Sequence, residues 1–160
     1  MANYSFKETL AYFCDKLQTQ PPEEDLKNEA VELLLDELRI VITKGALEGC
    51  LNMQIMLGLM LQPIREQKLK ELATSNFLGI NTGGCTLAFD EPGVSLSLLC
   101  HTSSGTTPQE NWEWLHRVVA VAREWNKVLA LWDEFVPLHV PKEEKSYEPA
   151  NKAIRQTFRG

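Results

Sequence analysis

The strongest pattern in this chain is an alternation of apolar and polar positions that marks out five strands. From Leu51 to Leu61 every odd position is apolar, which is the period of a β-strand. Residues 31–35 and 38–42 alternate in the same way around Asp36 and Glu37 and predict a hairpin, although the Glu, Leu and Ala of residues 29–38 also favour a helix. Residues 85–89 and 94–98 flank the turn-forming sequence DEPG and predict a second hairpin.

Three other segments place apolar residues at helical spacing. The first follows a capping box at Ser5 and Glu8 and ends at the prolines of residues 21–22. The second begins at Pro63 and ends near Gly79. The third begins with a capping box at residues 107–110 and runs to about residue 135. The order of helix, three strands, helix, two strands and helix predicts an α+β fold, with a twisted antiparallel sheet and helices packed on it.

The last helix is more apolar than one buried face requires. One stripe of apolar side chains is expected to face the sheet, and a second stripe needs a sheet, a partner or a ligand to cover it. Because four tryptophans cannot share one stripe, we expect at least one of them to be partly exposed or to lie at an interface. The first stripe contains Leu115, Val119, Ala122 and Leu129, and the second contains Trp114, Val118, Val121, Trp125 and Trp132.

Length and charge predict one acidic domain followed by a tail. Residues 1–136 contain 11 Lys and Arg against 19 Asp and Glu, whereas residues 137–160 contain 5 against 3. A net charge of −8 on the body argues against a nucleic-acid groove, which needs clustered cations. We expect residues 1–136 to form a single domain, with an acidic linker at residues 23–29. Residues 137–160, which are rich in proline and charge, are expected to form a flexible tail.

No residue pattern predicts catalysis, a metal or a cofactor. Cys14, Cys50, Cys85 and Cys100 have wide, irregular spacings, so we expect four reduced, packed thiols. Cys100 and His101 are adjacent on a predicted strand, where their side chains would point to opposite faces and could not act together. The chain begins without a signal-peptide pattern and has no apolar run long enough for a membrane span, so a cytoplasmic location and no membrane insertion are expected.

The order of these elements and three local phrases resemble the class I type III secretion chaperones, the family related to the Tir chaperone. The phrase MLGLMLQP at residues 56–63 is similar to the end of the strand that precedes the central helix of that family. The phrase LKELATSN at residues 69–76 is similar to the end of the central helix itself, and GGCTLAFD at residues 83–90 is similar to the strand that follows. The resemblance covers roughly residues 5–135.

The resemblance implies a non-catalytic homodimer in the bacterial cytosol. Such a protein holds the N-terminal segment of one or more effector proteins and keeps them soluble and competent for export, with the export ATPase as a further candidate partner. By resemblance, the dimer contact would be formed by Leu69, Leu72, Ala73, Asn76, Phe77, Leu87 and Phe89. Effector contacts would be formed by Leu10, Phe13, Leu17, Val31, Leu33, Ile40 and Ile42.

Two other hypotheses remain open at the level of sequence. A regulatory protein of the same architecture could sequester a secretion or transcription regulator, because one fold supports either role. A small hydrolase is a third hypothesis, and the sequence offers no triad for it. For each proposed contact residue, an ordinary place in the hydrophobic core is the competing interpretation.

Overall fold

The computed structural model describes residues 4–21, 23–90, 93–138 and 154–155, and it has the predicted α+β fold. The sheet has the strand order β4-β5-β3-β2-β1-β7, and β6 pairs with the end of β3. All of its described pairings are antiparallel. The strands are β1 (Ala30–Leu35), β2 (Leu38–Lys44), β3 (Leu51–Met60), β4 (Thr86–Phe89), β5 (Ser95–His101), β6 (Phe135–Pro137) and β7 (Ile154–Arg155).

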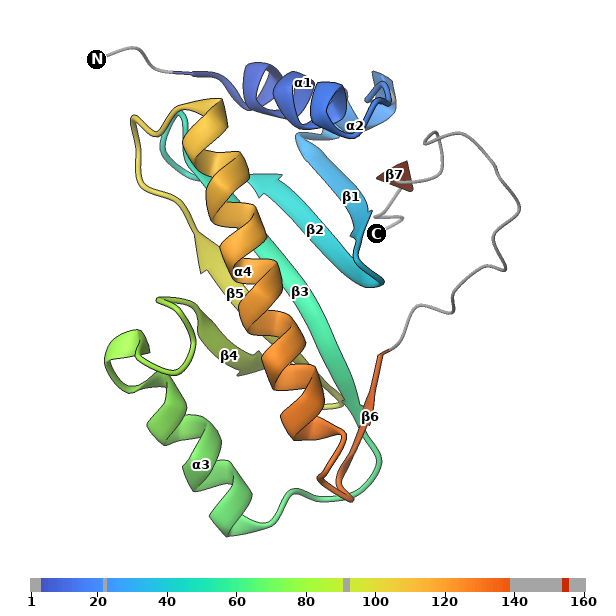
Figure 1. Cartoon of the computed structure of the whole chain (residues 1–160), viewed down its shortest axis with the longest axis vertical. Helices are drawn as coiled ribbons and strands as arrows, with labels where there is room; N and C mark the ends of the chain where they lie inside the picture. Colours follow the sequence, from blue (N-terminus) through green and yellow to red (C-terminus); the bar gives the residue numbers. More distant parts are fainter. Residues whose placement is uncertain (1–3, 22, 91–92, 139–153, 156–160) are drawn as a thin grey trace.

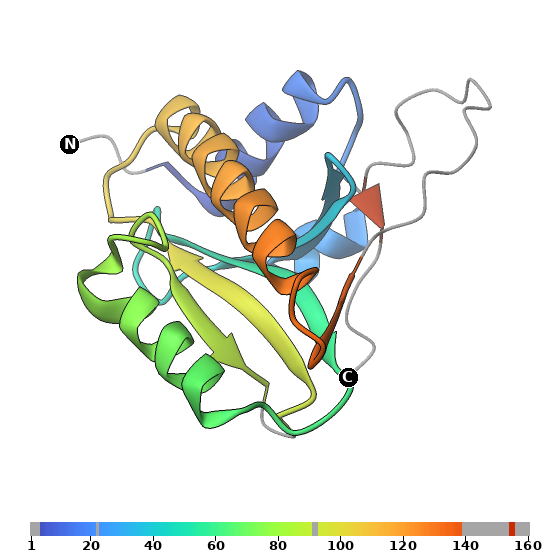
Figure 2. The ribbon, with the colours of Figure 1, turned by 60° about the horizontal axis from the view of Figure 1, so that its bottom comes forward.

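The helices lie mainly on one side of the sheet. The long helix α4 (Pro108–Leu129) crosses the sheet along β3, and α1 (Phe6–Lys16) packs beside its N-terminal half (Figure 1). The helix α3 (Glu66–Asn76) and the short 3-10 helix η1 (Phe77–Gly79) lie next to β4, at the far end of the sheet (Figure 2). A short helix, α2 (Glu23–Asn28), leads into β1.

Local sequence explains where these elements begin and turn. The predicted capping boxes are present in full, with Ser5 and Glu8 at the start of α1 and Thr107 and Glu110 at the start of α4. The β1–β2 hairpin turns through Asp36 and Glu37 alone, and both residues have positive φ, at 52° and 70°. This two-residue geometry matches the twist of the flanking strands, although glycine or asparagine is more usual there.

Inward-facing residues form continuous rows across the sheet. One row runs Leu33, Ile40, Ile55, Leu98 and Leu87, one residue from each of five neighbouring strands, and every member is at most 5% exposed. The first stripe of α4 is also buried, so the core lies between the helices and this face of the sheet. The alternation in the sequence therefore predicted the buried face correctly as far as Leu57, whereas Leu59 and Leu61 at its end are exposed.

Gly58 allows the chain after α4 to join the sheet. It follows an irregularity in the pairing of β3 with β5 and lies opposite Pro137 of β6. A Cβ atom at this position would lie 2.9 Å from the carbonyl oxygen of Val136. The absence of a side chain is therefore what permits β6 to approach β3.

Several predicted boundaries differ from the structure. Residues 23–28 form α2 rather than a linker, because three acidic residues in its first turn favour the helix N-terminus. The second predicted helix begins at Glu66 rather than Pro63, and α4 ends at Leu129, before a turn that leads into β6. Pro137 belongs to β6, and Leu138 donates a backbone hydrogen bond to Leu57.

The predicted flexible tail lies mostly outside the described residues. Within it, the backbone of residues 154–155 forms β7 on the edge of β1, opposite Glu32 and Leu33. The division at residue 136 therefore stays a prediction. Within the part of the chain that the structure describes, no helix has both the length and the apolar character needed to cross a membrane.

Candidate partner-binding surfaces

An apolar stripe runs along the outer side of α3 and η1. Leu69 and Ala73 are four residues apart on one face of α3, Phe77 follows directly after the helix with an extended backbone, and all three are exposed. Phe77 is 70% exposed, and Ile80 just beyond it is 75% exposed. We call Leu69, Ala73 and Phe77 the α3 stripe. Exposed large apolar residues grouped in this way are typical of a contact surface.

The other predicted dimer residues lie beneath or beside this stripe. Leu72 and Leu87 are buried within the single chain, at 4% and 5% exposure, so they are core residues here. The Asn76 side chain bonds to the backbone of Leu87, and Phe89 stacks on Phe135 with ring centroids 6.3 Å apart. The predicted set therefore divides into an exposed stripe and the layer that supports it.

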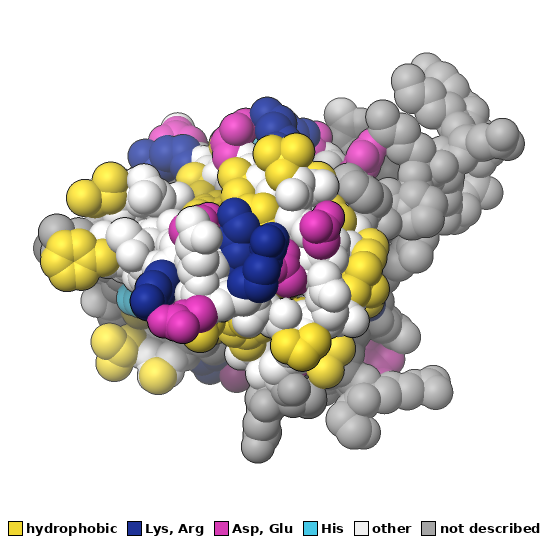
Figure 3. All heavy atoms as spheres, turned by 90° about the horizontal axis from the view of Figure 1, so that it is seen from below, with side chains coloured by type: hydrophobic (Ala, Val, Ile, Leu, Met, Phe, Trp, Pro, Cys, Tyr) yellow, Lys and Arg dark blue, Asp and Glu magenta, His cyan; other side chains and the backbone are white. Residues whose placement is uncertain are grey.

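The end of the molecule that carries α3 also has charged side chains. Figure 3 shows lysine or arginine side chains near the middle of this view, with acidic groups beside them and hydrophobic side chains nearer its margin. On α3, Lys70 pairs with Glu66, and Lys68 lies over the Trp132 ring at 4.5 Å from its centroid. The apolar surface at this end is thus interrupted by charge.

The predicted effector-binding residues are in the core, with one exception. Leu10, Phe13, Val31, Leu33, Ile40 and Ile42 are at most 2% exposed, and Leu17 is half-buried. The strand residues of this set occupy the sheet face under the helices, and Phe13 packs against Trp112. Their assignment to effector binding stays a prediction, and their burial in the folded single chain does not favour it.

A more accessible surface lies on the opposite face of the sheet. The row next to the core row runs Glu32, Val41, Gln54, Leu99 and Thr86. Val41, Gln54, Leu99 and Thr86, together with Thr43, Asn52 and His101, line an open depression of about 420 Å³. We call these seven residues the open sheet face. Sequence reasoning missed it because these residues, mostly at polar positions of the alternation, carry no pattern that distinguishes a binding face from ordinary solvent-facing positions.

Buried acidic groups flank this face at β1. Glu32 is 3% exposed and accepts hydrogen bonds from the guanidinium of Arg39, which is half-exposed. Asp25 of α2 is also 3% exposed, and its pKa is raised, first by burial and then by the charges of Glu24 and Glu32.

Burial, with a smaller effect of Asp25, raises the pKa of the Cys14 thiol to about 11. The Cys14 thiol is therefore protonated at neutral pH and poorly nucleophilic.

The cysteine prediction is wrong for one pair. Cys85 and Cys100 form a disulfide, whereas Cys14 and Cys50 are free thiols. The wide sequence spacing concealed the pair, because antiparallel pairing of β4 with β5 brings the two residues opposite each other. Cys100 is consequently not available as a nucleophile beside His101. In the described ranges, no group of three or more His, Cys, Asp or Glu side chains could hold a metal ion.

The tryptophans are covered by several elements rather than by one. Trp125 donates from its indole nitrogen to the carbonyl oxygen of Asn81 at 3.1 Å, which ties α4 to the loop after η1. Trp132 is buried after the end of α4. Trp112 and Trp114 remain partly exposed, as the sequence predicts. The surplus apolar surface of α4 is therefore met largely by α1, by the loop and by the region after α4.

Comparison with known proteins supports the fold. The structure is similar to one chain of the heterodimeric complex ExoU-SpcU from the type III secretion system of Pseudomonas aeruginosa. The match has a TM-score of 0.56 and 21% sequence identity, and it covers 74% of this chain and 92% of that chain. No family model and no curated protein matches the sequence. At this identity the likeness concerns the fold alone.

Proposed function

We propose that this protein is a type III secretion chaperone that binds the N-terminal segment of one or more effectors without catalysis. The observation that carries this proposal is the fold shared with a chain of a complex described as heterodimeric and belonging to a type III secretion system. In this role it would act in the bacterial cytosol and keep its partner soluble and competent for export.

We further propose that two copies associate through the α3 stripe. Phe77, Leu69 and neighbouring Ile80 are exposed apolar groups on one end of the molecule. A symmetric contact would remove this surface from water on both copies at once. Leu72 and Leu87 would support the contact from beneath rather than take part in it.

The open sheet face is the surface we propose for the effector segment, in place of the buried residues first assigned to it. Leu99 and Val41 provide apolar contact, while Gln54 and Asn52 provide amide groups for backbone recognition. An extended segment could place side chains in this depression, as peptides do in shallow grooves.

The proposal can be tested by co-purification followed by measurement with a defined peptide. The full chain is isolated from its native bacterium, bound proteins are identified, and the N-terminal segment of the main partner is titrated against the purified protein by calorimetry. Leu99→Asp should weaken binding about tenfold or more, because it places a charge in the apolar depression. Leu47→Asp is the control, since Leu47 is 64% exposed outside that face.

Each outcome has a defined meaning. Binding through an effector's N-terminal segment, weakened by Leu99→Asp but not by Leu47→Asp, supports both the role and the surface. Binding that Leu99→Asp leaves unchanged overturns the surface. A secretion or transcription regulator as sole partner supports the regulatory alternative, and no binding to any exported protein overturns the chaperone role.

A further inference from the structure

The Cys85–Cys100 disulfide joins the outermost strand of one sheet edge to its neighbour. Thr86 pairs with Leu99, so Cys85 and Cys100 form the next cross-strand pair, with Cα atoms 4.7 Å apart. Both residues are 4% exposed. The bond therefore closes the end of the β4–β5 ladder at the point where the loop from η1 enters the sheet.

Besides the disulfide, β4 is held by its ladder with β5, by the burial of Leu87, by the stacking of Phe89 on Phe135 and by Asn76. The strand is four residues long and ends the described strand order on this side. Besides its ladder with β5, Leu87 bonds through both backbone groups to the side chain of Asn76, at 2.9 Å and 2.7 Å. The position of α3, and with it the α3 stripe, is thus tied to β4.

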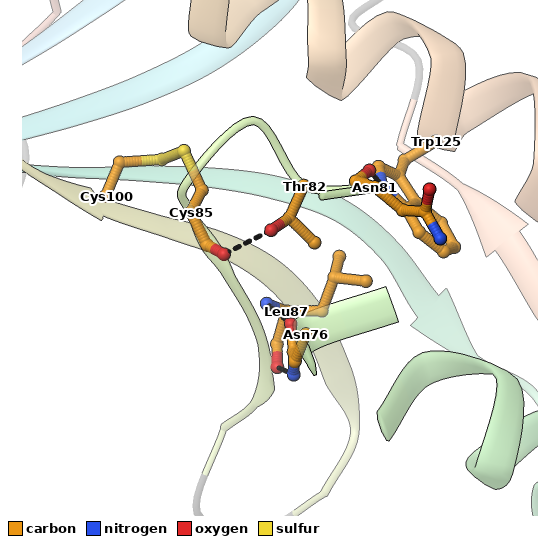
Figure 4. The surroundings of a disulfide bond; sticks show 7 residues. All are labelled: Asn76, Asn81, Thr82, Cys85, Leu87, Cys100 and Trp125. Carbon is orange, nitrogen blue, oxygen red and sulfur yellow. Dashed lines mark hydrogen bonds between the residues drawn. A yellow bond between two sulfur atoms is a disulfide. The ribbon is translucent and has the colours of Figure 1, made fainter. Parts of the chain in front are cut away.

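The loop on the other side of the bond is also ordered by specific contacts, shown in Figure 4. The Cys85 amide donates to the carbonyl oxygen of Thr82 at 3.1 Å, and the Thr82 hydroxyl donates back to the carbonyl oxygen of Cys85 at 2.5 Å. One residue earlier, Asn81 accepts the hydrogen bond from Trp125 of α4. The disulfide therefore lies between the contacts that position α4, the loop and β4.

We propose that this disulfide is a redox-sensitive cross-link that controls the order of β4 and of the α3 stripe. In the oxidised protein the cross-link keeps β4 paired, and Asn76 keeps α3 against it. In the reduced protein the end of β4 separates more often from β5, and the α3 stripe becomes less ordered.

The reaction is an ordinary thiol–disulfide exchange with a dithiol reductant. A thiolate of the reductant attacks one sulfur, the Cys85–Cys100 bond breaks, and a mixed disulfide forms while the other cysteine leaves as a thiolate. The second thiol of the reductant then releases the first cysteine. Two protein thiols form after protonation, and the reductant becomes a disulfide. Because both sulfurs are buried, β4 must open locally before attack.

The test compares oxidised and dithiothreitol-reduced full-length protein by amide hydrogen exchange, with the thiol state verified by mass spectrometry. We expect the Leu87 amide and the amides of residues 72–77 to exchange about tenfold faster or more after reduction. Amides of the central strands, such as Ile55, should not change to the same extent. Equal exchange at Leu87 in the two states overturns the proposal, as does a failure of oxidised glutathione to produce the disulfide.

Two variants separate this pair from the other cysteines. Cys14→Ala combined with Cys50→Ser retains the disulfide and should respond to dithiothreitol like the original protein. Cys85→Ala combined with Cys100→Val should show the fast exchange with or without reductant. Loss of the response in the first variant, or its persistence in the second, overturns the assignment to Cys85 and Cys100. If the second variant does not fold, the reduced original protein supplies the decisive comparison.

The consequence for self-association rests on the proposed function. If two copies meet through the α3 stripe, reduction should raise the dimer dissociation constant about tenfold, measured by sedimentation equilibrium. If the protein is monomeric in both redox states, the proposed dimer is overturned. The hydrogen-exchange data then still test the proposed role of the disulfide. A dimer with equal affinity in both states overturns the link between the disulfide and association.

Discussion

The Asn76 side chain pairs with both backbone groups of Leu87, donating from Nδ2 to the carbonyl oxygen and accepting from the amide at Oδ1. An asparagine at the end of α3 therefore occupies the position that another strand would take beside β4. A short strand at the margin of a sheet gains in this way a hydrogen-bonding partner on its second side.

Asn76→Ala should destabilise the protein by about 2 kcal/mol, because it leaves the Leu87 amide and carbonyl without their partner. The measurement is urea denaturation of both proteins under oxidising conditions. Thr74→Ala is the control, since Thr74 is exposed on the same helix and should change stability by no more than about 0.5 kcal/mol. Equal effects of the two substitutions would show that the hydrogen bonds between Asn76 and Leu87 do not contribute to the free energy of unfolding.

Phe77→Asp should convert a dimer into folded monomers, because Phe77 is 70% exposed in the single chain and belongs to the α3 stripe. Light scattering gives the mass, and circular dichroism checks the fold. Leu72→Asp is less informative, because Leu72 is buried and its charge would disrupt the core. Leu47→Asp is the control and should leave the measured mass unchanged. If Phe77→Asp remains a dimer, the α3 stripe is not the dimer contact.

Asp25→Asn should stabilise the protein at pH 7. The Oδ2 atom of Asp25 is buried and has no hydrogen-bond partner among the described residues, and burial is the main cause of its raised pKa. A carboxyl group whose pKa is raised by folding favours the folded state below its ordinary value of 3.8, and this contribution is lost as the pH rises through the raised pKa.

The amide variant should therefore have the higher melting temperature at pH 7, and the difference should disappear below about pH 3.8. Thermal unfolding across this pH range provides the measurement. Asp15→Asn, at an exposed position of α1, is the matched control and should show little difference at any pH. A lower melting temperature for Asp25→Asn at pH 7 would contradict the prediction.

Glu134→Gln should have the opposite pH dependence. The Glu134 side chain is 1% exposed, and the hydrogen bond from the exposed Arg65 guanidinium is the main cause of its lowered pKa. Its ionised form stabilises the folded state above the ordinary pKa of 4.5, and this stabilisation is lost as the pH falls through the lowered pKa.

The glutamine variant should consequently be less stable than the original protein at pH 7, and the gap should narrow on acidification below about pH 4.5. Glu124→Gln removes an exposed pair with Lys127 on α4 and should have almost no effect. A gap that stays constant with pH would mean that the ionised Glu134 is not what stabilises this region.

Asn111→Leu should raise the stability of the protein. Asn111 is 1% exposed, and neither its Oδ1 nor its Nδ2 atom has a hydrogen-bond partner within the described ranges. Replacing an unpaired amide by an apolar group of similar volume removes the cost of burying it. Urea denaturation should show a higher midpoint, whereas exposed Asn52→Leu should show little gain. A lower midpoint would contradict the prediction.

The strands could be predicted because their inward residues repeat strictly. Leu51, Met53, Ile55 and Leu57 are all at most 2% exposed, as their spacing predicts. The same regularity could not tell a core side chain from a partner contact, since both require apolar residues. Phe13 and Phe77 both follow the apolar spacing of a predicted helix. Phe13 is nevertheless 1% exposed, whereas Phe77 is 70% exposed.

Contacts between distant segments could not be predicted in this way. The Cys85–Cys100 pair depends on strand register, and the Asn76–Leu87 pair depends on where α3 ends relative to β4. The extra strand β6 depends on Gly58, whose missing side chain was interpreted only as part of a family phrase. Each of these features joins two local patterns that are unremarkable when considered separately.

The pairing of β6 with the end of β3 changes what shortening the chain would do. Pairing with β2 reaches only from Leu51 to Ile55 of β3, and β6 then covers Gly58 to Met60. Ending the protein before Phe135 would expose a seam of unsatisfied amides and carbonyls, where a strand from a second molecule could insert. A protein truncated there should aggregate through intermolecular β-pairing instead of remaining folded and soluble.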